Sequence, residues 1–361
     1  MTDIQTEAKK SLIVVSRALV LIVIMFIAVV GIFLGLLFDA GPSQQVKMSG
    51  GSSALGPTGT PITTTSSAPV AEKPISNTLW QAPDESKLPE GSERELILYG
   101  KDLIAHTAKY LGPRGTVAAI SNGMNCQNCH LDAGTKPWGN NYSAVYSTYP
   151  KFRARSGTNE TVVKRINDCF ERSLNGKPLD STSKEMEAMI AYMKWLGSGV
   201  EKGKQPEGVG LKKLAYLDRP ADPKKGAAVY SNKCVTCHGS AGEGISTPDK
   251  TEYLFPPLWG KNSYNDGAGL YRISNFASYV RNNMPLGANH ENPQLSEEES
   301  WDVAAYVNSQ SRPHKDQSRD WKDYSKKPID FPFGPYADKF TEKEHKLGPF
   351  NAIASFYKKE N

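Results

Sequence analysis

Two short cysteine–histidine motifs constrain this 361-residue chain more than any other feature. The first is Cys126-Gln-Asn-Cys129-His130 and the second is Cys234-Val-Thr-Cys237-His238. Two cysteines three positions apart, followed directly by histidine, are typical of covalent c-type haem attachment. The thiols form thioethers with the porphyrin vinyl groups, and the adjacent imidazole becomes the proximal iron ligand. The sequence therefore predicts two covalently bound haem c groups, with the four cysteines as attachment points and the two histidines as iron ligands.

A redox dithiol and half of a zinc site are the alternatives for a pair of cysteines at this spacing. Zinc would need further Cys or His pairs at short spacing, and the sequence lacks them. Five cysteines minus four thioethers leaves Cys169 as a single thiol. In the oxidising compartment where c-type haem is attached, Cys169 has no cysteine with which to form an internal disulfide.

The length and charge of the chain favour two domains that bind no nucleic acid. Each motif lies in a segment of roughly 100 residues, which is the usual size of a compact domain. The formal net charge of +5 is spread thinly, without basic runs that alternate with aromatic residues. We expect an all-α fold with two cytochrome c-like haem domains in tandem, residues 79–200 and 201–312. Residues 313–361 are rich in proline, lysine and aromatic residues, and we expect this tail to wrap the haem domains.

An uncharged stretch near the N-terminus predicts a membrane anchor. Residues 18–38 contain no charged side chain and follow several basic residues. A helix of this length spans roughly 30 Å, the thickness of the bilayer core, and the basic residues keep residues 1–17 in the cytoplasm. A cleaved signal peptide is the alternative, but its apolar region is usually shorter, at about 7–15 residues. Residues 39–78 are rich in Gly, Ser, Thr and Pro and are expected to be a flexible linker. We therefore expect a single-pass protein of the cytoplasmic membrane, with its haem domains on the periplasmic side.

Helical periodicity and capping residues predict five helices around the two motifs. These are Ser92–Leu111, a helix capped by Asn159 and ending at Gly176, Ser183–Leu196, Lys224–Asn232, and Ser296–Val307 with a capping box. The third helix carries three methionines on one face, and their helical spacing predicts core residues rather than iron ligands: Met186, Met189 and Met193. A Trp-Gly pair after each motif, and Trp and Tyr in the last helix of each half, indicate a diverged duplication.

The sixth iron ligand of the second haem is predicted from the loop before the last helix. The only methionine between His238 and that helix is Met284. A thioether ligand raises the reduction potential, so this haem is expected to accept electrons and pass them out. The competing ligands in this segment are His290, Lys250 and Lys261.

The first half offers a different ligand. Between His130 and the helix that starts at Ser183 there is no methionine and no second histidine, so the soft ligands reduce to Cys169. The alternative is that Cys169 is a small core residue, as buried free cysteines usually are.

Charged residues around Cys169 favour a functional site. On a helix, Arg165, Cys169 and Ser173 recur every four residues and share one face, with Arg172 beside them. Flanking guanidinium groups favour the thiolate form, which is both a metal ligand and a nucleophile. Together with Arg155 in the preceding loop, these residues predict a pocket for an anion.

With these residues in place, the sequence resembles the dihaem thiosulfate dehydrogenases, which couple two thiosulfates into tetrathionate; some members work as tetrathionate reductases. The similarity covers most of the chain from about residue 80 to 355. The segments that carry it are 149–155, 165–176, 255–260, 283–285 and 333–338.

The resemblance implies ligands and pocket residues at matching positions: His130 and Cys169 at the active-site haem, Arg155, Arg165 and Ser173 in the substrate pocket, and His238 and Met284 at the second haem. Some members carry a lysine directly before this methionine and exchange ligands on reduction, whereas this chain has Asn283. The resemblance also implies thiosulfate or tetrathionate as substrate and an external electron partner, such as a cytochrome c, an iron–sulfur protein or a membrane redox complex. The membrane anchor departs from the soluble members.

Two other functions compete with this interpretation. A membrane-anchored dihaem electron carrier, such as an oxidase subunit, needs no substrate pocket and predicts methionine or histidine as sixth ligand on both haems. A dihaem peroxidase needs an open or displaceable histidine-ligated site, and no well-placed histidine follows His130.

The electron count also fits the thiosulfate interpretation. Coupling of two thiosulfates releases two electrons, and two haems can each hold one.

Overall fold

The computed structural model of the chain describes Met25 and residues 79–359. All the helices and strands given below belong to one compact unit, Lys73–Asn361. The predicted cytoplasmic N-terminus, membrane anchor and linker lie outside the described residues, apart from Met25. No helix in the described part of the chain is long and apolar enough to cross a bilayer.

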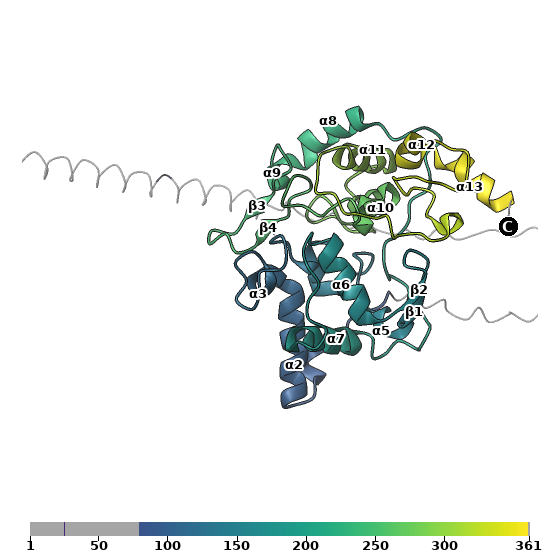
Figure 1. Cartoon of the computed structure of the whole chain (residues 1–361). Helices are drawn as coiled ribbons and strands as arrows, with labels where there is room; N and C mark the ends of the chain where they lie inside the picture. The colour runs from purple at the N-terminus through teal and green to yellow at the C-terminus, as the bar shows by residue number, and fades with distance from the viewer. Residues whose placement is uncertain (1–24, 26–78, 360–361) are drawn as a thin grey trace, which may run out of the picture. The chain divides into compact units, whose positions relative to one another are not determined.

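The described residues form two successive groups of helices, followed by a C-terminal segment (Figure 1). The first group contains α2 (Ser92–Ala105), α3 (Thr107–Leu111), α4 (Leu131–Gly134), α5 (Val145–Thr148), α6 (Val162–Arg172) and α7 (Lys184–Leu196). The second group contains α8 (Pro223–Lys233), α9 (Val235–His238), α10 (Ile273–Asn283) and α11 (Glu297–Asn308). The C-terminal segment contains α12 (Glu342–Leu347) and α13 (Phe350–Lys359).

The first and last long helices of each group pack directly against each other, α2 on α7 and α8 on α11. A glycine makes each contact possible. A Cβ atom on Gly100 of α2 would lie 2.0 Å from the Ala188 carbonyl oxygen of α7, and one on Gly226 of α8 would lie 1.9 Å from the Asp302 carbonyl oxygen of α11. The same close approach in both halves supports a duplicated cytochrome unit.

Several predicted helix boundaries are confirmed by their caps. The Ser183 hydroxyl accepts from the Met186 backbone N–H at 3.2 Å at the start of α7, and Ser296 and Glu299 form a reciprocal capping box before α11. The prediction of one helix over Ser92–Leu111 is wrong in detail, because the backbone leaves helical geometry at His106 and separates α2 from α3.

The predicted start of the cysteine-bearing helix is also wrong. Thr161, not Asn159, caps α6, and its hydroxyl accepts from the Lys164 backbone N–H. Asn159 lies instead in β2 (Thr158–Glu160), which pairs antiparallel with β1 (Lys151–Arg153). The helix then ends at Arg172 rather than at Gly176.

Two short hairpins modify the all-α prediction. Besides β1 and β2, the strands β3 (Ile245–Ser246) and β4 (Tyr253–Phe255) form a second antiparallel pair. Strands of two or three residues are too short to show an alternating pattern, so the sequence gives no signal for them. Helix α10 was not predicted either, although its C-terminal end presents Met284.

The methionine-rich face of α7 lies in the core, as predicted. Met186 and Met189 are fully buried, and Met193 is buried as well. Met189 and Met193 have a further role, because they line the cavity beside the first haem motif.

The C-terminal segment contacts both halves. Phe350 of α13 packs against Trp301 of α11, with ring centroids 5.6 Å apart. Asp320, earlier in the segment, accepts a hydrogen bond of 2.8 Å from the Arg172 guanidinium at the end of α6. Helices α12 and α13 were not predicted, because the tail is poor in helical periodicity.

Polar contacts join the two halves near the haem motifs. The Tyr279 hydroxyl of α10 donates to the Asn128 carbonyl oxygen inside the first motif at 2.8 Å. The Asn265 amide donates to the Glu171 carbonyl oxygen of α6 at 2.8 Å. The two halves therefore share an interface that includes the first Cys-x-x-Cys-His segment.

Candidate functional site

The two motif histidines have the same local geometry. His130 Nδ1 lies 2.6 Å from the Asn140 carbonyl oxygen, and His238 Nδ1 lies 2.9 Å from the Pro256 carbonyl oxygen. Since a carbonyl oxygen only accepts, each Nδ1 carries the proton and each Nε2 has a free lone pair. Burial lowers the pKa of His130 to about 4 and also lowers the pKa of His238, so both rings are neutral at pH 7. Neutral imidazoles in this tautomer are suited to bind iron through Nε2.

Each motif opens onto a cavity that fits a haem. The first cavity has a volume of about 590 Å³, and the second about 370 Å³. Each contains both cysteines and the histidine of its motif, together with sulfur-bearing side chains from other segments. The motif residues and the predicted sixth ligand are Cys126, Cys129, His130 and Cys169 in the first cavity and Cys234, Cys237, His238 and Met284 in the second. Met124, Met189 and Met193 also line the first cavity, and His106, Met124 and Cys129 also line the second. The donor sets and the space beside them fit one covalently attached haem in each half.

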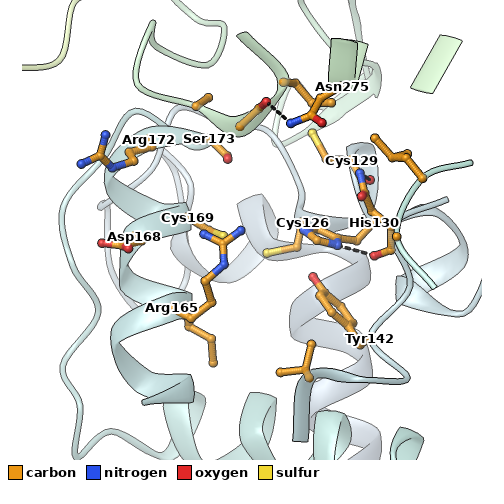
Figure 2. Close-up of a pocket in the computed structure, with 18 of the residues that line it drawn as sticks. Cys126, Cys129, His130, Tyr142, Arg165, Asp168, Cys169, Arg172, Ser173 and Asn275 are labelled. Carbon is orange, nitrogen blue, oxygen red and sulfur yellow. Dashed lines mark hydrogen bonds between the residues drawn. The ribbon is translucent and has the colours of Figure 1, made fainter. Parts of the chain in front are cut away.

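Helix α6 presents three of the predicted site residues to the first cavity. Figure 2 shows Arg165, Cys169 and Ser173 on the same side of the helix, facing the space in front of Cys126 and His130. This is the arrangement that their four-residue spacing predicts. Cys169 therefore stands across the cavity from the motif histidine, where a sixth iron ligand is needed.

The neighbouring charged residues of α6 point the other way. Figure 2 shows Asp168 and Arg172 on the opposite side of the helix from Cys169. Arg172 donates to Asp320, and Arg155 forms an ion pair with Asp168. Arg172 therefore lines the same cavity as Cys169, as its position beside the cysteine predicts, but its guanidinium is turned toward Asp320. Arg155 also lines the cavity, and its guanidinium is paired with the Asp168 carboxylate.

Arg165 differs from the other arginines of the cavity. Within the described part of the chain, no carboxylate lies at ion-pair distance from it, whereas each of the other four has such a partner. Those four are Arg153, Arg155, Arg172 and Arg272. The nearby Cys169 sulfur raises the pKa of Arg165, which keeps its guanidinium charged.

The wall of the first cavity is strongly cationic. Seven of its lining residues carry positive side chains, and Asp168 is its one acidic residue among those described. The cations are Lys151, Arg153, Arg155, Arg165, Arg172, Lys213 and Arg272. Burial, together with Arg153 and Arg165, lowers the pKa of Lys151, as expected where positive charges are crowded. Haem carboxylates would neutralise part of this charge, and the remainder favours an anionic ligand.

The second cavity is smaller and has no comparable excess of cations. Met284 caps the C-terminus of α10 and lines the same cavity as His238. The residues that line it, within the described ranges, do not include the competing candidates Lys250, Lys261 and His290.

Asn283, which precedes the methionine, is held away from the haem site. Its amide nitrogen donates to the Trp138 carbonyl oxygen at 3.1 Å and to the Tyr279 carbonyl oxygen at 3.2 Å. Of the candidates for the sixth ligand of the second haem, Met284 is the one that lines the cavity with His238.

Sequence reasoning missed several residues of the first cavity. Lys213 belongs to the connection between the halves, and Trp321 and Phe331 come from the C-terminal segment. The aromatic composition of that segment indicated packing, but no local pattern tells which cavity a distant tail covers.

Comparisons with known families agree with the division into two haem domains. The family model described as "SoxA/TsdA, cytochrome c domain" matches residues 116–201, and the one described as "Cytochrome c" matches residues 223–311. With the donor sets above, these matches show that the chain carries two covalently bound haem c groups.

Curated relatives and a solved structure narrow the family. The chain is 35% identical over 243 residues to a thiosulfate dehydrogenase of Stutzerimonas stutzeri, a match covering 67% of this chain and 76% of the relative. It is 38% identical over 242 residues to that of Psychrobacter arcticus, covering 66% and 70% of the two chains. It is 38% identical over 247 residues to that of Allochromatium vinosum, covering 67% and 87%.

A solved thiosulfate dehydrogenase (TsdBA) from Marichromatium purpuratum superimposes with a TM-score of 0.61 at 33% identity. The match covers 66% of this chain and 50% of the solved chain, which is longer. The extent and identity of these matches place the chain in the thiosulfate dehydrogenase family.

Proposed function

We propose that this protein joins two thiosulfate ions into tetrathionate in the first cavity and passes the electrons out through the second haem. The observation that carries the proposal is the difference between the two cavities. The first is larger, cationic and has a cysteine facing the motif histidine, whereas the second has a methionine and no excess of cations. The names of the relatives support thiosulfate as the substrate.

The proposal assigns the iron ligands from the donors that line each cavity together with its motif histidine. His130 and Cys169 would hold the first haem iron, and His238 and Met284 the second. When bound, the two haems supply acceptors for one electron each, and the thioether of Met284 favours the reduced state of the second.

Arg165 and Arg155 bind and orient the substrate in this proposal. Arg165 lies one helical turn before Cys169 and has a charged guanidinium without a carboxylate partner among the described residues. It is suited to hold the sulfonate oxygens, with the outer sulfur toward Cys169. Arg155 reduces the repulsion when the second dianion enters, and the Ser173 hydroxyl offers a neutral hydrogen bond one turn beyond the cysteine.

Cys169 acts as the sulfur carrier. Its thiolate and the outer sulfur of the first thiosulfate form an S–S bond with the release of two electrons, which leaves a sulfonated persulfide on the protein. The outer sulfur of the second thiosulfate attacks the adduct sulfur that lies between the Cys169 sulfur and the sulfonate group. The bond to the Cys169 sulfur breaks, the Cys169 thiolate leaves, and tetrathionate forms. The same groups, used in reverse with two added electrons, cleave tetrathionate into two thiosulfates.

Steady-state assays of the purified holoprotein test the proposal. Thiosulfate with an artificial electron acceptor, and tetrathionate with a reduced donor, measure the two directions. Cys169→Ala and Cys169→Met are expected to abolish turnover while both haems stay covalently attached, as seen by haem staining and mass. Near-normal turnover in either variant would rule out the sulfur-carrier role.

A plain electron carrier is the second candidate, and one observation favours it. Met189 and Met193 line the first cavity, so a thioether is available there as well. Such a carrier would show two methionine-ligated haems. A low-spin thiolate-ligated signal beside one methionine-ligated signal, in magnetic and near-infrared spectra of the oxidised protein, supports the enzyme instead.

The N-terminal segment is proposed to anchor the protein in the cytoplasmic membrane, with both haem domains on the periplasmic side. The support is the uncharged run 18–38 behind basic residues, followed by the polar linker 39–78. The full chain is expected in the membrane fraction and released by detergent but not by salt. Release by salt alone would contradict the anchor.

A further inference from the structure

A buried indole N–H without a partner lines the first cavity. Trp321 is 9% exposed, and its Nε1 atom has no hydrogen-bond acceptor among the described residues. More than about 90% of buried polar groups in proteins are hydrogen-bonded, because an unpaired donor loses its water without compensation. Trp321 Nε1 therefore indicates a missing acceptor in this cavity.

The backbone fixes the position of this donor. The Trp321 backbone N–H donates to the Arg155 carbonyl oxygen at 2.7 Å, and the preceding Asp320 accepts from Arg172 at 2.8 Å. The indole packs edge-on against Phe331, with centroids 5.3 Å apart. The backbone φ of Trp321 is 60°, which is unfavourable for a bulky residue and persists only where the surrounding structure determines it. The C-terminal segment thus holds the indole beside a predicted substrate arginine.

We propose that the Trp321 indole N–H donates a hydrogen bond to a sulfonate oxygen of the substrate bound by Arg155. The inference rests on the proposed function, since it assigns a further substrate-binding residue to the same site. A sulfonate has three oxygens, so one can meet the indole while the others meet guanidinium groups. A neutral donor adds direction without further charge, which suits a cavity where crowded cations already repel one another.

Trp301 provides the internal comparison. It is more deeply buried, at 1% exposed, but its Nε1 donates to the Ala215 carbonyl oxygen at 3.0 Å, and it does not line either haem cavity within the described residues. The chain therefore satisfies one buried indole internally and leaves the other, in the lining of the first cavity, without an acceptor among the described residues.

The test replaces each indole by a ring that cannot donate. Trp321→Phe is expected to raise the KM for thiosulfate about tenfold or more with little change in kcat, because the lost bond is present in both the ground and transition states. Trp301→Phe, the matched control, is expected to lower the thermal midpoint while leaving KM unchanged. Trp321→His, which retains a ring N–H, is expected to recover part of the affinity.

A haem carboxylate is the competing acceptor for this donor. In that case, Trp321→Phe would shift the reduction potential of the first haem and leave the KM for thiosulfate unchanged, and this result would overturn the proposal. An unchanged KM together with an unchanged potential would overturn it as well.

Equilibrium titration with thiosulfate separates this inference from the proposed function. Wild-type protein that binds thiosulfate calorimetrically but does not oxidise it would refute the function, and weaker binding by Trp321→Phe would still support the donor. Wild-type protein that binds no thiosulfate would refute both.

Discussion

Arg165 is the arginine whose loss is expected to weaken thiosulfate binding most directly. It faces the cavity on the same side of α6 as Cys169 and has no carboxylate at ion-pair distance among the described residues. A hydrogen bond to a charged group contributes roughly 1.5–3 kcal/mol, and each 1.4 kcal/mol corresponds to a factor of about ten. Arg165→Gln is therefore expected to raise KM by roughly 10- to 150-fold. Arg165→Lys keeps the charge but loses the planar pair of donors, so its KM should lie between those of the wild type and Arg165→Gln.

The assay is steady-state oxidation of thiosulfate by the holoprotein with an artificial acceptor, at low and moderate salt. Arg94→Gln is the matched control, because Arg94 lies on α2, outside the lining of both cavities, and its guanidinium donates to the Glu85 and Leu88 carbonyl oxygens at 3.4 and 3.5 Å. Its KM is expected to stay within about twofold of wild type, since removal of one distant surface charge is largely screened. A wild-type KM in Arg165→Gln, or an equal loss in Arg94→Gln, would refute a specific contact between Arg165 and the anion.

Three further predictions follow from the fold and the second haem. Gly100→Ala is expected to destabilise the protein by about 1–3 kcal/mol in denaturant unfolding, because the new methyl group meets the α7 backbone; without this contact, alanine in a helix would stabilise by up to about 1 kcal/mol. Burial raises the pKa of Asp330, but the Arg272 guanidinium and the Ser274 bonds outweigh it and leave the pKa below its usual value. Asp330→Asn is expected to cost about 3–5 kcal/mol near pH 7. The difference from wild type should shrink as pH falls below about 4, where the carboxyl group protonates first in the unfolded state, and should be smallest once the pH is also below the lowered pKa of the folded state. The Asn283 side chain is hydrogen-bonded to backbone carbonyls, so the second haem should keep Met284 as its ligand in both redox states. The near-infrared spectrum of the oxidised protein should therefore be the same before and after a cycle of reduction and reoxidation.

Local patterns in the sequence were enough to predict the parts of the site that one helix or one motif determines. The motif spacing gives the haem attachment points, and a four-residue recurrence puts Arg165, Cys169 and Ser173 on one face of α6. Each is a short-range consequence of covalent geometry or helical pitch. Caps such as Ser296 were also predictable, because the capping box involves residues only three positions apart.

Contacts between distant segments were not predictable in the same way. Arg172 and Asp320 are 148 positions apart, and their ion pair turns Arg172 away from the cysteine. Asn159 and Thr161 are both good capping residues, and the choice between them depends on the β1–β2 hairpin, which pairs Asn159 with Phe152. Long-range pairing therefore decided which of several locally acceptable structures formed.

The two halves differ at one equivalent position, and this difference yields a last prediction. Helices α6 and α10 both contain 11 residues and both precede the last long helix of their half. Their C-caps are Ser173 and Met284. Where the second half presents its thioether, the first half presents a small hydroxyl, and the sulfur of Cys169 lies one turn earlier on the same face of α6. In the proposed function, the small side chain leaves room for substrate next to this sulfur.

Ser173→Met should therefore convert the first site toward a carrier. The new side chain fills the space beyond Cys169 and places a thioether where the second half has one, so turnover should fall at least about 100-fold, as expected for a blocked near-attack position. In the double variant Cys169→Ala, Ser173→Met, the first haem should show a methionine-ligated spectrum without thiosulfate oxidation. Ser173→Ala is the control and should retain most activity, because it removes a neutral hydrogen bond but keeps the space. Wild-type turnover in Ser173→Met would mean that the C-cap of α6 does not border the substrate, and the equivalence of the two helix ends would then have no bearing on catalysis.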